Sequence, residues 1–383
     1  MSYGTRGIPQ SRRTSGRVGL ILLASGCVLA VVGGLTAAGP QAGDPKREGL
    51  AFGDPYATQP ATAPAGDEPA AGAEIVSPAD AAIMVYVPAG EFVMGIDPTD
   101  ADKIAKDLGY TKVDDLWAWE AYPSHKVNLP GYFIDKYEVT VEQWQKFVQA
   151  AGQGSPPRSP AAAGSSTSKY RETTQHFDKP AEQALPAGEI RWDEAKKYAA
   201  WAGKSLPTEA QWEKAARGSD GRLYPWGNDG PTHQHGHFGK KRGESGQMPL
   251  LYTWVGRYPE GASPYGCMDM LGNQYEWTGE MLVPYPGNPQ VDKMKEYAGT
   301  FACLRGGSWY HGWVGYYAAK RFGFKPDETY YHVGLRTVWT PPKGYFQSED
   351  FKKAREAVKQ RKAQLAEMVE KAQQAEKAAE KKS

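Results

Sequence analysis

The chain has 383 residues, enough for one large domain or two smaller ones. Its 45 basic and 44 acidic side chains give a formal net charge of +1, which excludes the strongly basic surface expected of a nucleic-acid-binding protein. Twelve tryptophans, 22 tyrosines, 44 glycines and 29 prolines indicate a loop-rich domain packed with aromatic rings, not a helical bundle.

The N-terminal region contains a candidate membrane segment. Residues 1–17 are polar and carry four arginines and no acid, and residues 18–38 (VGLILLASGCVLAVVGGLTAA) form an uncharged run long enough to span a bilayer. The preceding arginines predict an N-terminus inside the cell and a periplasmic or otherwise extracytoplasmic main domain. A single-pass anchor is the preferred interpretation. A cleaved signal peptide ending near Ala38 and a lipoprotein cut before Cys27 are the alternatives.

Residues 39–80 are rich in Ala, Pro and Gly and show no apolar period, so they are expected to form an extended linker. The folded domain is expected over 81–345. Its first part should contain short strands at 84–87, 92–94, 122–127 and 132–134, with partly helical structure between 97 and 119. A Gly/Ser/Pro/Ala insertion at 152–168 predicts a surface loop.

Three helices are expected in the middle of the domain. The first follows Thr140 as N-cap (VEQWQKFVQA), and its apolar residues recur on one face. The second is DEAKKYAAWAG (193–203), which ends at a glycine. The third is EAQWEKAARG (209–218), with Thr208 as N-cap and Gly218 beyond its end. From there to Arg336 the sequence predicts short strands and long loops.

The last segment, 348–383, has a different composition. It is rich in Ala, Lys, Glu and Gln and contains no Gly or Pro, and Phe351, Val358, Leu365 and Ala372 lie seven residues apart. This pattern predicts a long helix. Arg361 interrupts the second apolar stripe, which weakens a coiled-coil interpretation. Both a partner-binding helix and a solvated single helix therefore stay open.

Four segments together carry a family resemblance: MVYVPAGEFVMG (84–95), KSLPTEAQWEKAARGSDGRLYPWGN (204–228), SPYGCMDMLGNQYEWT (263–278) and LRGGSWYHGWVGYYAAKRFGFKPDETYYHVGLR (304–336). Their order and content resemble the formylglycine-generating enzyme family, the sulfatase-modifying factors, over about residues 83–341. The resemblance implies a mixed α+β fold, distantly like C-type lectins, with few helices, short twisted strands and much loop.

The resemblance also implies an active site from which this sequence departs. Catalytic members carry two cysteines after the GGS element, which bind copper(I), and one engages the substrate cysteine. The matching positions here are His311 and Tyr316. Neither supplies the soft thiolates that copper(I) and thiol exchange require, so copper is not expected. Ser308, Trp309, His311, Tyr316 and Arg321 are candidates for a retained ligand pocket. The alternative is that the aromatic rings here simply pack as core.

Two further metal sites are suggested. By resemblance, a structural calcium would bind the backbone oxygens of Leu271, Gly272 and Gln274 and the carboxylate of Glu276, while a second family calcium site lacks its asparagine here. His233, His235 and His237 alternate, which on a strand would place them on one face as metal ligands. The alternative for these histidines is an exposed polar loop.

Beyond the apolar run, the cysteines are Cys267 and Cys303. They fit either buried apolar positions or one disulfide bridge.

Taken together, the sequence favours a non-catalytic, membrane-anchored, extracytoplasmic binding or structural subunit of an envelope complex. The expected partners are membrane or envelope proteins, with no nucleic acid and no identified ligand. One alternative is a metal-dependent oxidoreductase in which His311, with His332 or the histidine loop, holds iron or copper. The other is formylglycine generation with Cys267 or Cys303 replacing the missing thiols.

Overall fold

The computed structural model describes residues 68–111, 118–152, 180–239, 252–295, 298–310, 316–328 and 330–381. The expected membrane segment at 18–38, most of the linker and His311 therefore lie outside the described residues. Among the residues that are described, no helix is both long enough and apolar enough to cross a membrane.

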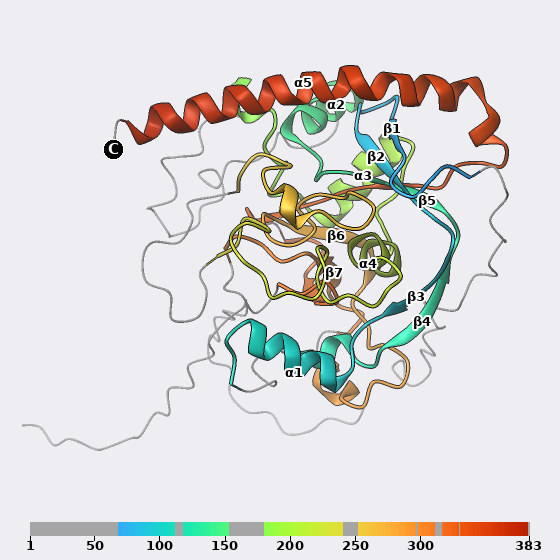
Figure 1. Ribbon diagram of the computed structural model, residues 1–383, viewed down its shortest axis with the longest axis vertical. Coiled ribbons are helices and arrows are strands. Elements are labelled where there is room, and N and C mark those ends of the chain that lie inside the picture. The colour runs from blue at the N-terminus through green and yellow to red at the C-terminus, as the bar shows by residue number, and fades with distance from the viewer. Residues whose placement is uncertain are drawn as a thin grey trace, which may run out of the picture. The chain divides into compact units, whose positions relative to one another are not determined.

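Two four-stranded sheets and a two-stranded ribbon make up the β-structure of the described part (Figure 1). The first sheet has the order β1-β2-β5-β10 and is antiparallel throughout. Its strands are β1 (Glu74–Val76), β2 (Ile83–Val87), β5 (Tyr132–Asp135) and β10 (Val338–Trp339). The antiparallel ribbon pairs β3 (Gly90–Met94) with β4 (His125–Leu129).

The second sheet has the order β8-β7-β6-β9 and is built from the C-terminal half of the domain. Its strands are β6 (Tyr275–Met281), β7 (Ala302–Arg305), β8 (Phe322–Phe324) and β9 (Val333–Gly334). Strand β9 pairs with β6 in parallel, and the other pairs are antiparallel. Strand β7, which ends at Arg305 just before the GGS element, and strand β9, which contains Gly334 of the GLR element, thus lie on either side of β6.

The expected helices are present. They are α1 (Pro98–Asp107), α2 (Val141–Ala151), α3 (Trp192–Trp201), α4 (Glu209–Arg217) and α5 (Glu349–Glu380). The N-caps are confirmed, because the side chain of Thr140 accepts from Gln143 N and that of Thr208 from Gln211 N. Single 3₁₀ turns lie at Ala118–Ala121, Pro180–Glu182, Pro259–Gly261, Val291–Met294 and Tyr345–Gln347.

The folded domain begins earlier than expected. Strand β1 falls inside the predicted linker, pairs with β2, and buries Ile75 to 2% exposure. Asp80 is also fully buried, and its carboxylate accepts a hydrogen bond from Lys204 Nζ at 2.8 Å. The linker boundary at residue 80 was therefore wrong. A three-residue strand is too short to show an alternating pattern, so no periodicity indicates it.

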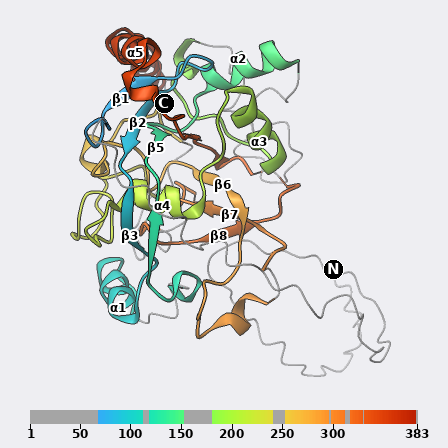
Figure 2. The ribbon, with the colours of Figure 1, turned by 90° about the vertical axis from the view of Figure 1, so that its right-hand side faces the viewer.

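Helix α5 is continuous and packs along its own domain, beside β1 and the Pro180–Glu182 turn (Figures 1 and 2). Phe351, Leu365 and Ala372 are buried, as their seven-residue spacing predicts. Arg361 is buried as well, at 6% exposure, and pairs with Glu142 of α2. The long helix is confirmed, and one of its faces is covered by the domain instead of by solvent.

Candidate functional site

The position expected to hold a second thiol is filled by a buried phenol. Tyr316 has no exposed surface, and its hydroxyl donates to the Ser308 carbonyl at 2.6 Å and accepts from Gly239 N at 2.8 Å. Its ring lies 4.3 Å from the ring of Phe238. Burial raises the pKa of Tyr316 well above its ordinary value. The side chain therefore acts as a neutral packing and hydrogen-bonding group at neutral pH.

The other pocket candidates are also buried. Ser308 and Trp309 are 0% and 1% exposed, and Trp309 N donates to the Asn273 carbonyl at 3.1 Å. Arg321 is fully buried and faces Glu209 of α4, with nitrogen–oxygen distances of 2.6 and 2.7 Å. The structure thus joins Ser308 and Tyr316 directly but places Arg321 in a separate ionic network. The interpretation of these residues as core agrees with this burial.

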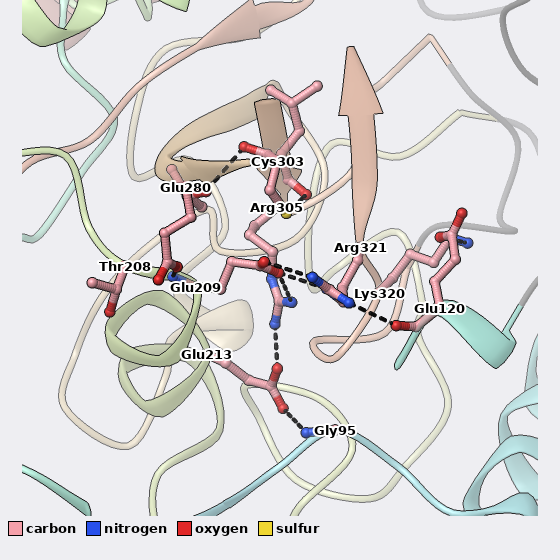
Figure 3. A network of polar contacts seen from close by, with 12 residues as sticks. Gly95, Glu120, Thr208, Glu209, Glu213, Glu280, Cys303, Arg305, Lys320 and Arg321 are labelled. Atoms are coloured by element: carbon pink, nitrogen blue, oxygen red, sulfur yellow. Dashed lines mark hydrogen bonds and ion pairs between the residues drawn. The ribbon is translucent and has the colours of Figure 1, made fainter. Parts of the chain in front are cut away.

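That network connects α4 to the second sheet (Figure 3). Glu209 pairs with Arg321 and Glu213 with Arg305, all four side chains being fully buried. Arg305 also donates to the Ala318 carbonyl at 3.0 Å. Burial alone would raise the pKa of Glu209, but Arg321 and Arg305 outweigh it and hold that pKa below its ordinary value. The ion pairs tie the LPTEAQWEKAARG helix to the RGGSW strand.

A second buried network surrounds the expected calcium segment. The Glu276 carboxylate accepts from Arg336 at 2.6 and 2.7 Å and from Trp212 Nε1 at 2.7 Å. The Glu138 carboxylate accepts from Asn273 Nδ2 at 2.6 Å and from Gln274 N at 3.1 Å. Asp269 uses one oxygen to accept from Gly256 N at 2.6 Å. Its other oxygen, Oδ1, is buried and has no hydrogen-bond partner among the described residues.

The charges of this second network do not balance. Glu138, Asp269 and Glu276 bring three carboxylates near one paired guanidinium, that of Arg336, which leaves an excess of two negative charges if all three ionise. Burial, followed by the neighbouring Asp269 and Glu276, raises the pKa of Glu138 well above its ordinary value. Burial raises the pKa of Asp269 to about 6. Such a site favours either bound protons or a bound cation.

The one carboxylate of the expected calcium set, that of Glu276, is already paired with Arg336. Among the described residues, no three His, Cys, Asp or Glu side chains form a metal-binding group. Both oxygens of Glu276 already accept hydrogen bonds, from Arg336 and Trp212. Asp269 Oδ1 is the carboxylate oxygen of this network that has no partner, and each oxygen of Glu138 accepts one hydrogen bond and keeps a second lone pair for a hard cation. The sequence did not indicate Glu138, because it lies more than a hundred residues from the GNQYEWT segment.

The histidine loop does not gather its three side chains. Residues 233–235 form a turn and not the strand that alternation would require. The ring of His235 stacks on Trp226 at 4.2 Å, whereas His237 Nδ1 lies 3.2 Å from the Tyr258 hydroxyl. His233 is exposed. The expected common face for a metal was therefore wrong, because the chain turns within the motif.

The two described cysteines are free thiols. Cys267 and Cys303 are completely buried and form no disulfide. Burial raises the pKa of Cys267 to about 11 and that of Cys303 well above its ordinary value. The disulfide alternative is therefore not realised, and the interpretation as buried apolar cysteines is confirmed.

The family assignment follows from a match that spans most of this domain. Residues 73–341 match the family model described as sulfatase-modifying factor enzyme 1-like domain. The chain belongs to this family. The expected resemblance to the formylglycine-generating enzymes is thereby confirmed, and so is the mixed α+β fold.

Named relatives of the sulfatase-modifying-factor family include enzymes of two kinds. The hercynine oxygenase of Mycobacterium tuberculosis is 37% identical over 211 residues, which cover 49% of this chain and 47% of that protein. The formylglycine-generating enzyme of Bos taurus is 28% identical over 293 residues, covering 66% and 73%. The chain thus spans about half the length of the hercynine oxygenases it matches.

Among solved structures, PvdO from Pseudomonas aeruginosa has the same fold. The two superpose with a TM-score of 0.51 at 21% identity, covering 71% of this chain and 99% of PvdO. This likeness concerns the fold alone, since function depends on the site residues.

Proposed function

We propose that this chain is a non-catalytic, membrane-anchored binding or structural subunit of an envelope complex, built on a sulfatase-modifying-factor domain. The observation that carries the proposal is the burial of Tyr316, whose hydroxyl bonds to Ser308 and Gly239 where a reactive thiol is expected. Cys267 and Cys303 are buried with raised pKa values, so neither offers a thiolate at neutral pH.

The proposal also includes where the domain is located and which class of molecule it binds. The apolar run at 18–38, preceded by arginines, supports a single-pass anchor with the domain outside the cytoplasmic membrane. The near-neutral charge of the chain supports protein partners over nucleic acid. Stoichiometric proteins that copurify with the detergent-solubilised chain would identify these partners.

The absence of thiol chemistry can be tested directly. The purified chain, supplied with copper(I) and oxygen, is expected to convert none of the cysteine in a sulfatase peptide to formylglycine, and Cys303→Ser is expected to behave identically. The formylglycine-generating enzyme of Bos taurus is the positive control. Maleimide labelling of Cys267 and Cys303 should be at least about a hundredfold slower in the native chain than in urea, because both thiols are buried. Product that disappears in Cys303→Ser would contradict the proposal.

An altered oxidoreductase is the second candidate, favoured by the similarity to hercynine oxygenases. A redox metal would need His311 together with His332 or the histidine loop, and in that loop His235 and His237 already contact different partners. Metal analysis of the purified chain decides between the two functions. Stoichiometric iron or copper that is lost in His311→Ala would overturn the non-catalytic proposal.

We further propose that Glu138 and Asp269, with nearby backbone oxygens, hold a structural calcium ion. The excess of two negative charges and the unpartnered Asp269 Oδ1 support a divalent cation with a preference for oxygen. When bound, calcium would supply positive charge in place of protons. It would join the loop before β6 to the segment that follows β5.

The calcium proposal predicts an unusual pH dependence. Without calcium, the free energy of unfolding should fall as the pH rises from about 4 to about 7, by up to about 3 kcal/mol, because Asp269 titrates near 6 when folded but near 3.9 when unfolded. In this window the folded chain binds more protons than the unfolded chain, so raising the pH favours unfolding. Calcium should restore the stability at pH 7.

Urea unfolding at pH 4.5 and pH 7, with calcium or EDTA, measures this effect. Asp269→Asn is the control, since it removes one of the two carboxylates with a raised pKa and should reduce the pH dependence while it weakens the response to calcium. Equal stability of the unmodified chain in calcium and EDTA at pH 7 would rule out the calcium site.

A further inference from the structure

The residues that follow the family match bury one face of the first sheet. The match ends at residue 341, and the aromatic residues Tyr345, Phe346 and Phe351 come after it. The ring of Phe346 lies 5.4 Å from that of Tyr86 in β2, and the ring of Phe351 lies 5.4 Å from both Tyr345 and Phe346. Tyr86 is only 1% exposed. The face of β2 that carries Tyr86 is therefore covered by a segment from outside the matched family domain.

Strand β1 is the edge strand of that sheet and the first strand of the described chain. It has three residues, and among the described strands it pairs only with β2. Two backbone hydrogen bonds extend this pairing, from Gly72 N to the Tyr86 carbonyl at 2.8 Å and from Ser77 N to the Ala82 carbonyl at 2.9 Å. A strand with so few hydrogen bonds of its own is typical of segments that open locally, unless other contacts hold it.

Helix α5 supplies such contacts, and it runs beside β1 in both views (Figures 1 and 2). Ile75 belongs to the same buried apolar cluster as Phe351. The neighbouring Glu74 accepts a hydrogen bond from Lys136 at 2.7 Å and pairs with Lys362 of α5. Because consecutive side chains of a strand point to opposite faces, the helix reaches β1 from both faces and lies across its outer edge. A helix in this position closes an edge that could otherwise pair with another strand.

The ion pair of Glu74 persists at neutral pH. Burial raises the pKa of Glu74, but the hydrogen bonds from Lys136 and Lys362 outweigh it and hold that pKa below its ordinary value. The turn after β1 is also held by the helix, because Arg361 Nε donates to the Ala81 carbonyl at 2.8 Å. Both the first strand and its turn thus have partners on α5.

The helix itself is fixed to the domain on either side of these contacts. Phe351 packs near its start, as described above. Farther along, Leu365 and Ala372 lie in a buried apolar cluster with Trp254, and this cluster contains no residue of β1. Contacts at two separate places therefore hold α5 against the outer edge of β1.

We propose that residues 345–372 form a strap that holds β1 in the domain, so that β1 and α5 open as one unit before the rest of the domain. Strand β1 leaves β2 only after the helix has left its outer edge, since the helix covers that edge and carries partners of Glu74 and Ala81. The linker and the apolar run at 18–38 precede β1 in the sequence, so the strap would resist a pull through the linker. That mechanical role rests on the membrane anchor proposed above, whereas the coupling of β1 to α5 does not.

Amide hydrogen exchange of the detergent-purified full-length chain, followed by mass spectrometry, measures this coupling. In the unmodified chain, peptides from β1 and from residues 352–372 of α5 should show the same protection, and it should be lower than that of β7. Leu365→Ala removes a buried contact from the cluster that contains no residue of β1. It should nevertheless speed exchange in α5 and β1 by the same factor, at least about tenfold.

The matched control is Leu304→Ala in β7, the same chemical change at a fully buried position in a cluster that contains no residue of α5. It should speed exchange in β7 and leave β1 and α5 unchanged, because the second sheet stays folded when the strap opens. Should Leu365→Ala prove too unstable to purify, Lys362→Gln removes only the pair with Glu74 and should speed exchange in β1 and α5 about twofold.

Faster exchange in β1 than in α5 of the unmodified chain would overturn the strap, and so would β1 exchange that does not follow that of α5 in Leu365→Ala. In either case β1 would be held without the helix. Equal acceleration of β1, α5 and β7 in Leu304→Ala would also overturn it, since β1 would then open only with the whole domain. Recovery of the chain in the soluble fraction after carbonate extraction of membranes would instead refute the anchor and leave the coupling intact.

Discussion

Replacing Glu209 with alanine is expected to lower the free energy of unfolding by about 3–5 kcal/mol, the usual result of removing one partner from a buried ion pair. Glu209 and Arg321 are both fully buried, and the guanidinium would lose both carboxylate contacts, at 2.6 and 2.7 Å. Arg321 would keep the carbonyls of Glu120 and Val283 as acceptors but would lose the Glu209 carboxylate. Urea unfolding at neutral pH measures the loss.

The control for Glu209→Ala is Glu328→Ala, which removes a half-exposed partner of Lys325 and Tyr330 and should change stability by about 1 kcal/mol at most. Glu209→Gln is also informative, because it keeps the shape and part of the hydrogen bonding but removes the charge. We expect the loss of stability in Glu209→Gln to lie between the losses in Glu209→Ala and Glu328→Ala. A loss for Glu209→Ala no larger than that for Glu328→Ala would mean that Arg321 is solvated in solution, in conflict with its burial.

The role of Arg321 shows what the sequence could and could not predict. The family resemblance placed Arg321 at the former active site with Ser308 and Tyr316, whereas the structure pairs it with Glu209, apart from the Ser308–Tyr316 contact. Its partner, Glu209, lies 112 residues earlier in the chain, and no local pattern joins the two. Side chains that pair across such separations are fixed by the sheet and helix packing, not by nearby sequence.

Local elements were more predictable. Thr140 and Thr208 are the expected N-caps, and with a glutamine three residues later each also forms a capping box, because a cap depends only on residues within one turn. The pattern in α5 likewise identified its buried face through Phe351, Leu365 and Ala372. Arg361 was predicted to weaken the apolar stripe. It is buried beside them because Glu142 and the Ala81 carbonyl, both distant in sequence, satisfy its charge and donors.

Replacing Gly334 with alanine is expected to destabilise the domain by about 1–3 kcal/mol, the range for overpacking a closely packed core. An added Cβ would lie 2.3 Å from Gln274 Oε1 and 2.6 Å from the Ala187 carbonyl oxygen. The second contact is with backbone, so a change of rotamer cannot relieve it. Gly334 also pairs with Glu276 across the two sheet strands β9 and β6, so a shift here would disturb the Glu276–Arg336 pair.

The matched control is Gly279→Ala in β6, where the nearest atom would lie at 3.6 Å, an ordinary contact. It should be neutral or slightly stabilising. The double variant Gln274→Ala/Gly334→Ala should lose less stability than the two single losses combined, by at least about 0.5 kcal/mol, because the shorter side chain removes one of the two clashes. The remaining loss of stability would come from the contact between the added Cβ and the Ala187 carbonyl oxygen. Stability of Gly334→Ala equal to that of Gly279→Ala would show that β9 can move away from Gln274, and that the glycine of the GLR element is not required for close packing.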